Sequence, residues 1–264
     1  MPTEVVPLGV PGRSKAERVR AMFTRIVPRY DLMNKIMTMG LDRAWRRAAV
    51  RAAMPRGALA LDVGTGTGDL AIELAQAGAR QVIGADFCEE MLRAARAKVQ
   101  RRIADGALAF VVGDALSLPF PDATFDCVVN GFLLRNVASL SEAFAEMSRV
   151  LRPGGRLVCL EITHPPSSLA PFFSLYFNRV VPLLGAVFTG EAGAYQYLPR
   201  SLGPLPEASH LAAMIAQAGF VDVRYRRLGL GTVALHIGKR EEKLEQRHRP
   251  RPSGQLLHPL SGER

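Results

Sequence analysis

Apolar and polar positions repeat along this chain with two different periods. Before residue 56, apolar residues recur at helical spacing, which predicts helices over 14–27 and 29–53 with a break near Pro28. After residue 57, short apolar runs alternate with amphipathic stretches. The runs predict strands at 58–63, 81–86, 108–115, 125–132, 156–162, 221–227 and 232–238, and the stretches predict helices at 69–78, 89–104, 140–151 and 210–220. This alternation predicts an α/β fold with a doubly wound, mostly parallel sheet.

Three segments interrupt that alternation. RPGG at 152–155 predicts a turn, and the polar, proline-containing stretch 241–264 predicts a mostly disordered tail. The segment 169–188, LAPFFSLYFNRVVPLLGAVF, is strongly apolar, but we do not expect it to span a membrane, because helix breakers and polar residues interrupt it. These interruptions are Pro171, Asn178, Arg179 and Pro182.

The net charge of +10 is concentrated at the two ends of the chain. Residues 1–60 contain 12 Lys and Arg against 4 Asp and Glu, and residues 239–264 contain 7 against 4. A basic end suits an anionic membrane surface or nucleic acid, and a solvated arginine-rich helix face would explain it equally well. The three cysteines form no CxxC pair, which predicts buried thiols in a reduced, cytoplasmic protein and no metal site.

The stretch LDVGTGTGD at 61–69 carries the first candidate chemistry. Its glycines are spaced GxGxG rather than the GxGxxG of dinucleotide sites, and Asp69 follows them where a phosphate loop has Lys-Ser/Thr. Asp86 ends the next strand run, where a carboxylate accepts hydrogen bonds from a ribose. Asp69 would repel a diphosphate but tolerates an ammonium group. The pattern therefore favours a nucleoside ligand without phosphate.

Further motifs follow the glycine loop in order: VVGDA at 111–115, PFPDATFDCVV at 119–129 and RVLRPGGRLV at 149–158. Over about 61–165 this succession resembles the class I methyltransferases that use S-adenosyl-L-methionine. The resemblance implies that cofactor and a Rossmann-like sheet of seven strands, with an N-terminal helical lid and a helical insert after the fifth strand. The residues expected to contact it are Gly64, Thr65, Gly66, Thr67 and Gly68 at the methionine part, Asp86 at the ribose, Asp114 and Ala115 at the adenine, and Gly131 through its backbone amide.

Segments on either side of these motifs are more specific. YDLMNKIMTMGLDRAW at 30–45, FLLRNV at 132–137 and RVLRPGGRLVCLEITHP at 149–165 closely resemble the C-methyltransferases of menaquinone and ubiquinone biosynthesis, over roughly 14–240. The resemblance implies C-methylation of a polyprenylated quinol, first of all demethylmenaquinol to menaquinol. The alternatives are a 2-polyprenyl-6-methoxy-1,4-benzoquinol, or another lipid or small molecule. Departures from the family pattern occur at Thr38, Asp42, Gly131 and Leu133, where serine, histidine, serine and glycine are usual.

The resemblance also implies an organisation in segments. These are an N-terminal helical lid (1–56), the S-adenosylmethionine-binding core (57–165), an apolar substrate-cap insert (166–208), the remainder of the core sheet (209–240) and the tail (241–264). The insert would line a tunnel for the polyprenyl tail, or else serve ordinary packing or a homodimer interface. The basic N-terminal region would contact the inner face of the membrane as a peripheral partner.

Three residues are the candidates for catalysis. Arg135 and Asn136 follow the fourth strand run, where a cation beside a developing phenolate would lower its pKa, and the alternative is a structural ion pair of Arg135. Tyr30 would close over the ligands from the N-terminal helices, and the alternative is a turn after Pro28. His164 is a candidate base within reach of solvent and His236 is expected in the core, so neither is assigned to catalysis.

Three other functions compete with this interpretation. A nicotinamide-dependent oxidoreductase would need GxGxxG and a catalytic Tyr/Lys or His group, which the motifs do not supply. A nucleic-acid methyltransferase would carry Asn/Asp-Pro-Pro-Tyr/Phe after the fourth strand run, where this chain has NGFLL, so no nucleic-acid partner is expected. A non-catalytic protein that binds S-adenosylmethionine would keep the same glycine loop, and a turnover assay separates it from an enzyme.

Overall fold

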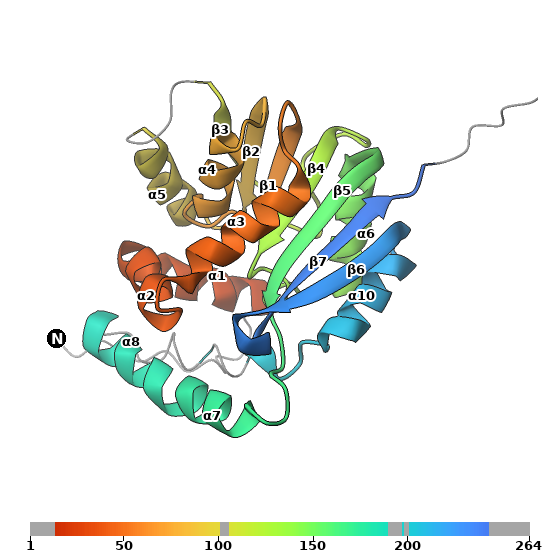
Figure 1. Ribbon diagram of the computed structural model, residues 1–264. Coiled ribbons are helices and arrows are strands. Elements are labelled where there is room, and N and C mark those ends of the chain that lie inside the picture. The colour runs from red at the N-terminus through yellow and green to blue at the C-terminus, as the bar shows by residue number, and fades with distance from the viewer. Residues whose placement is uncertain (1–13, 101–105, 190–196, 198–200, 243–264) are drawn as a thin grey trace, which may run out of the picture.

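A twisted seven-stranded sheet forms the centre of the computed structural model, which describes residues 14–100, 106–189, 197 and 201–242 (Figure 1). The strand order is β3-β2-β1-β4-β5-β7-β6. The strands are β1 (Leu59–Val63), β2 (Gln81–Asp86), β3 (Leu108–Val112), β4 (Phe125–Gly131), β5 (Leu151–Ile162), β6 (Phe220–Leu228) and β7 (Val233–Arg240). β1 to β5 pair in parallel, and β7 runs antiparallel to both β5 and β6. The predicted doubly wound, mostly parallel sheet is confirmed.

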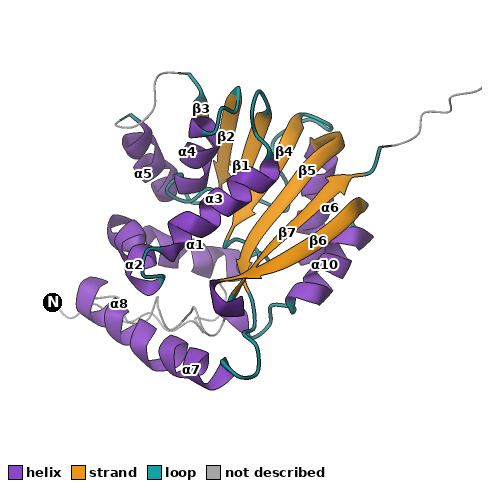
Figure 2. Ribbon diagram, in the orientation of Figure 1, coloured by secondary structure: helices purple, strands orange, loops and turns teal. Residues whose placement is uncertain are grey.

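Helices cover both faces of this sheet (Figure 2). One apolar cluster packs α3 (Leu41–Ala53) and α4 (Asp69–Gln76) against it, and a second packs α6 (Leu140–Val150) and α10 (Ala208–Gln217). α5 (Glu89–Val99) contacts β2 and β3. All three cysteines are buried and free, as predicted. Strands buried on both sides explain the nearly continuous apolar runs of the sequence.

A helical layer lies beyond the carboxyl ends of the parallel strands, with α7 and α8 at the lower edge of Figure 1 and α1 and α2 above them. It contains α1 (Lys15–Ile26), η1 (Val27–Arg29), α2 (Tyr30–Met37), α7 (Ala170–Leu175), η2 (Tyr176–Val180) and α8 (Val181–Thr189). Met22, Ile26, Met33 and Val181 form its buried core. α2 and α8 therefore pack together although about 150 residues separate them in the chain.

Two predicted boundaries are wrong. The helix predicted over 29–53 is two helices, because Met39 and Gly40 take left-handed backbone conformations between α2 and α3, with φ of +51° and +77°. The turn predicted at 152–155 lies inside β5, whose pairing with β4 is irregular between Phe125 and Cys127. Gly154 has φ of +76°, so the glycines bend a strand instead of ending one.

The apolar segment is helical, and the prolines expected to interrupt it do not break the helix. Residues 170–189 form a continuous helical run, because Pro171 lies in the first turn of α7 and Pro182 in the first turn of α8, where the π-helical η2 precedes it. By length and composition alone, Ala170–Phe188 is sufficient to cross a membrane, and 11% of it is buried. The predicted tail 241–264, beyond Glu242, and residues 101–104 of the predicted helix 89–104 lie outside the described residues.

Candidate functional site

The candidate site lies where the sheet order reverses. β1 has β2 on one side and β4 on the other, so the loops after β1 and β4 leave the sheet in opposite directions and open a crevice between them. The loop after β1 begins at Gly64, and the segment after β4 begins at Phe132. Because these three strands are parallel, their carboxyl ends bring residues that are far apart in sequence to one edge.

Two adjoining pockets at this edge form what we call the glycine-loop cleft. Both are lined by Gly64, Asp86, Phe87, Leu133 and Asn136. One continues past Gly113, Asp114 and Ala115, and the other continues past Phe23, Tyr30, Gly66, Gly131 and Phe132. Six of the nine predicted cofactor contacts therefore line a single cleft, namely Gly64, Gly66, Asp86, Asp114, Ala115 and Gly131.

The other three predicted contacts do not line the cleft. The Thr65 hydroxyl donates to Asp62 at 2.6 Å, and the Thr67 hydroxyl donates to Asp31 at 2.5 Å. Gly68 faces the protein interior, where an added Cβ would lie 3.1 Å from the ring of Phe110. The threonines thus stabilise the loop and leave the lining of the cleft to alternate glycines.

Asp86 holds the glycine loop in place from the end of β2. Its carboxylate is buried and accepts the backbone N–H of Gly66 at 2.8 Å and that of Cys88 at 2.9 Å. Burial raises the pKa of Asp86, and the two N–H donors oppose that shift. Asp114, in contrast, is exposed and accepts the Leu116 N–H at 2.9 Å. Each carboxylate retains lone pairs that a ligand hydroxyl or amine can use.

A larger cavity, which we call the apolar chamber, adjoins this cleft. It encloses about 1060 Å³ of empty space, part of it open to solvent, between α2, α3, the end of β4, α7 with η2, and η3 (Gly229–Gly231). Tyr30 and Phe132 line both the cleft and the chamber. The two spaces therefore meet at this pair of rings, so two ligands can face each other there.

Backbone strain is concentrated around the chamber. Met39, Phe132 and Leu230 all line it, and all three have left-handed backbone conformations, with φ of +51°, +60° and +58°. Met39 and Leu230 are also 80% and 82% exposed. Side chains of this size rarely adopt such conformations, and strain of this kind clusters at ligand-binding sites.

The structure separates the predicted catalytic residues. Arg135 lines the chamber, while Asn136 lines the cleft, where it accepts a hydrogen bond from the Tyr197 hydroxyl at 3.3 Å. Arg135 is also paired, because its Nη1 lies 2.7 Å from Oε1 of the buried Glu161. Its Nε is buried and has no hydrogen-bond partner among the described residues. Arg135 therefore forms the structural ion pair that was the alternative to a catalytic role, and the same side chain also lines the chamber.

Tyr30 lies at the junction in its neutral form. Burial raises the pKa of its hydroxyl, and a hydrogen bond with Asn34 and the charge of Arg135 oppose that shift. Neither histidine is part of the site. His164 hydrogen-bonds the carbonyl of Leu205, and His236 is buried against the carbonyl of Ala208, as expected for a core residue.

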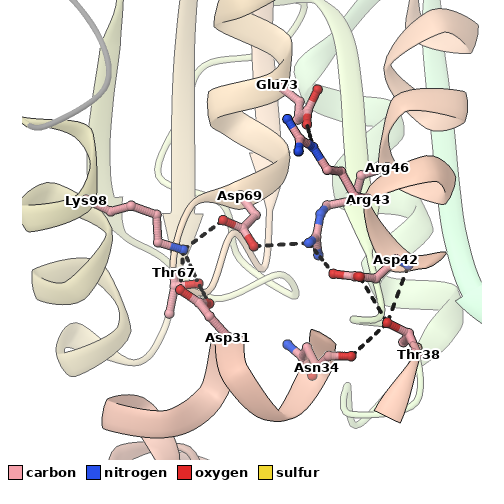
Figure 3. Close-up of polar contacts among 10 residues, drawn as sticks. All are labelled: Asp31, Asn34, Thr38, Asp42, Arg43, Arg46, Thr67, Asp69, Glu73 and Lys98. Atoms are coloured by element: carbon pink, nitrogen blue, oxygen red, sulfur yellow. Dashed lines mark hydrogen bonds and ion pairs between the residues drawn. The ribbon is translucent and has the colours of Figure 1, made fainter. Parts of the chain in front are cut away.

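An ion-pair network connects the two spaces, and the sequence analysis did not identify it (Figure 3). Lys98 of α5 lies 2.6 Å from Asp31 of α2 and 2.7 Å from Asp69 of α4. Arg46 of α3 lies 3.1 Å from Asp69 and pairs with Asp42. The network runs from the glycine loop to the chamber wall. Only the spacing of four residues between Asp42 and Arg46 signalled part of it in the sequence.

Residues 12–240 match the sequence model of the ubiE/COQ5 methyltransferase family. The demethylmenaquinone methyltransferase of Roseiflexus castenholzii is 47% identical over 90% of this chain and 98% of its own length. The enzyme of that name from Deinococcus radiodurans is 46% identical over 86% of this chain and 94% of its own. The ubiquinone/menaquinone biosynthesis C-methyltransferase UbiE of Desulfotalea psychrophila is 45% identical over 85% and 91%.

Solved structures with lower sequence identity to this chain have a similar fold. The [4+2]-cyclase SpnF superposes with a TM-score of 0.64 at 18% identity, over 89% of this chain and 99% of its own. A Thermotoga maritima S-adenosylmethionine-dependent methyltransferase, described as a possible histamine N-methyltransferase, gives 0.60 at 19% identity, over 84% and 100%. Their chemistries differ, so these neighbours define the fold alone.

Proposed function

The chain belongs to the ubiE/COQ5 methyltransferase family, and on this premise we propose that it methylates a ring carbon of demethylmenaquinol to give menaquinol. It is an S-adenosylmethionine-dependent C-methyltransferase of quinone biosynthesis. The observation that carries the proposed acceptor is the apolar chamber that meets the glycine-loop cleft at Tyr30 and Phe132. The alternative acceptor is a 2-polyprenyl-6-methoxy-1,4-benzoquinol, which the UbiE relatives keep open.

The cleft fits the cofactor. A Cβ at Gly66 would meet only Tyr30, at 3.9 Å, and one at Gly131 only Leu70, at 3.4 Å, so the glycines leave open space along the cleft wall. In the proposal Gly64 and Gly66 hold the methionine part, Asp86 the ribose, and Asp114 with Ala115 the adenine. The bound cofactor supplies an electrophilic methyl group on a sulfonium.

Arg135 would activate the acceptor ring. Attack by a ring carbon requires an electron-rich ring, which a quinol becomes when one of its oxygens carries negative charge. The guanidinium lines the chamber, so it can stabilise that oxygen. Tyr30 and Phe132 would hold the ring in line with the cleft, since alignment contributes most to such a transfer.

A methyl-transfer assay tests the acceptor. The protein is incubated with methyl-labelled S-adenosylmethionine and, under reducing conditions, with demethylmenaquinol or with the polyprenyl methoxybenzoquinol. We expect labelled menaquinol as the main product. Label in the benzoquinol alone would replace the proposed acceptor with the alternative, and label in neither would overturn the proposal of a quinol acceptor.

We further propose that the helical run 170–189 rests on the cytoplasmic face of the membrane. Its outward side exposes Phe172, Leu175, Leu183 and Val187, and the run contains no acidic residue. The exposed Met39 and Leu230 line the chamber, which gives the prenyl tail an apolar exit towards lipid. The run would lie on the membrane rather than span it, because its inner side packs on α2 through the buried Val181.

Vesicle sedimentation tests this contact. The double variant Phe172→Ser/Leu183→Ser should reduce binding to anionic phospholipid vesicles, whereas Val221→Ser, on the exposed edge strand β6, should not. Equal binding by both variants would contradict the proposal. The alternative is that this face binds a second copy of the chain. Sedimentation velocity without lipid tests it, because a dimer that dissociates in the double variant would assign the surface to the second copy.

A further inference from the structure

We propose that the Asp42 carboxylate selects the reduced acceptor, by accepting a hydrogen bond from a quinol hydroxyl that the quinone lacks. The inference rests on the proposed function, because it assigns a role in the same chamber. Asp42 is a position at which this chain departs from the family pattern. Its carboxylate accepts hydrogen bonds, whereas the guanidinium of Arg135, which also lines the chamber, donates them.

Asp42 is a buried carboxylate in a chamber wall that also contains Asn34, Thr38 and Arg46. It lies in the first turn of α3, is 5% exposed, and lines the chamber beside Trp45 and Leu41. A charge in such a place is costly unless it has partners. One carboxylate oxygen accepts the Thr38 hydroxyl at 2.9 Å, and the other pairs with Arg46. The carboxylate is thus held by two partners while it lines the space where the acceptor ring would lie.

The two partners of Asp42 leave part of its capacity to accept hydrogen bonds unused. An ionised carboxylate has about four acceptor positions and no donor, and the two side-chain contacts occupy two of them. The remaining lone pairs can bind a ligand only through a hydrogen that the ligand donates. A quinol and its quinone have nearly the same shape, but only the quinol has O–H groups. A quinone would direct carbonyl lone pairs at this carboxylate, which is repulsive.

Arg135 supplies the opposite chemistry on another wall. A guanidinium has donors and no acceptor, so it suits the oxygen that becomes negative during attack. That oxygen is the one next to the reacting ring carbon. The second hydroxyl, across the ring, remains protonated and can donate to Asp42. The pair therefore sets the orientation of the ring as well as its oxidation state, and it keeps the carboxylate away from the developing negative charge.

Trp45 provides a readout that does not depend on turnover. It is the only tryptophan of the chain and it lines the chamber. Its fluorescence is titrated anaerobically with 1,4-naphthoquinol or 1,4-naphthoquinone in the absence of methyl donor. The wild-type protein should bind the quinol about 100-fold more tightly, since a site built around a ligand hydroxyl rejects the analogue without it.

Asp42→Asn is the decisive variant, because its amide has the same shape but both donates and accepts. The preference for quinol should fall to within about threefold. The matched control is Asp69→Asn, which removes the other carboxylate that pairs with Arg46 but does not line the chamber, and it should keep the preference. Thr38→Val removes a competing donor from Asp42 and should strengthen quinol binding, which provides a second test if Asp42→Asn unfolds.

The outcomes separate this inference from the proposed function. Equal affinity of the wild-type protein for both probes, or an unchanged preference in Asp42→Asn, would overturn the role of Asp42 even if menaquinol is formed. A preference that is lost in Asp42→Asn and kept in Asp69→Asn supports that role. If that result is obtained but neither demethylmenaquinol nor the polyprenyl methoxybenzoquinol is methylated, the binding role of Asp42 stands and the proposed function fails.

Discussion

The glycine-loop cleft and the apolar chamber meet at Tyr30 and Phe132 but are built in different ways. Residues at or just after the ends of β1, β2, β3 and β4 line much of the cleft. Residues of α2, α3, the segment after β4, the end of β5, α7, η2 and η3 form the chamber. In the proposed function, the topology of the sheet therefore positions the cofactor, whereas the packing of the added helices shapes the space for the acceptor.

Arg135 should show the largest effect, and it tests the chamber. Arg135→Gln should lower kcat by about 1000-fold if the guanidinium stabilises a developing phenolate. It should also lower the free energy of unfolding by about 3 kcal/mol, because Glu161 stays buried without its partner. Methyl transfer and urea unfolding measure the two effects. The double variant Arg135→Gln/Glu161→Gln should regain stability but not turnover, and recovered turnover would reduce Arg135 to a structural role.

Gly64 tests the cleft in the same way. Gly64→Ala should weaken S-adenosylmethionine binding by about 100-fold in calorimetry, because Gly64 has φ of +68° and its added Cβ would lie 2.6 Å from Leu133. Gly57→Ala is the control, since Gly57 has φ of +74° but no neighbour within 4 Å. Equal S-adenosylmethionine binding by both variants would show that the cofactor does not depend on the space left by Gly64.

Lys98 tests the connection between the two regions. Lys98→Met should lower the free energy of unfolding by about 2 kcal/mol, a figure reduced from that of a fully buried pair because Asp31 is 45% exposed. It should also make α1 and α2 more sensitive to proteolysis, since Asp31 loses its ion pair. Lys35→Met, at an exposed position of α2, should leave both measurements unchanged. Unaltered proteolysis in Lys98→Met would show that apolar packing alone holds the helical layer.

Asp62, beneath the glycine loop, should give the smallest effect per step of the measurement, because its contribution to stability is spread over several pH units. Burial raises its pKa to about 7, above the ordinary value of 3.8, so between these values the folded protein holds a proton that the unfolded chain has released. Stability from this group should therefore fall as pH rises from about 4 to about 7, by about 1 kcal/mol per pH unit. Asp62→Asn should lack this component, as urea unfolding at pH 5, 6 and 7 will measure. Parallel pH profiles would refute it.

The sequence predicted the cleft better than the chamber for a physical reason. Strand runs and the loop that follows each of them are local patterns, so Gly64, Gly66 and Asp86 could be placed at one sheet edge before the structure was known. The sequence did not separate Thr65 and Thr67, whose hydroxyls bond Asp62 and Asp31, from the glycines that line the cleft, because alternation along a loop does not reveal which side faces a ligand.

The chamber depends on contacts between distant segments. Trp45 and Phe132 lie on different elements, and no local period indicates that they share a cavity. Arg135 was identified as a cation at a strand end, but its partner Glu161 is 26 residues away, on β5. The break between α2 and α3 depends on left-handed conformations at Met39 and Gly40, and helical periodicity continues across it in the sequence.

A structure of the protein with S-adenosylhomocysteine and a 2-prenyl-1,4-naphthoquinol would test the account most directly. We predict the thioether sulfur in the glycine-loop cleft and the naphthalene ring in the apolar chamber beside Trp45. The unsubstituted ring carbon should face the sulfur between Tyr30 and Phe132. A ring bound outside the chamber, or a sulfur that faces away from this junction, would contradict the account.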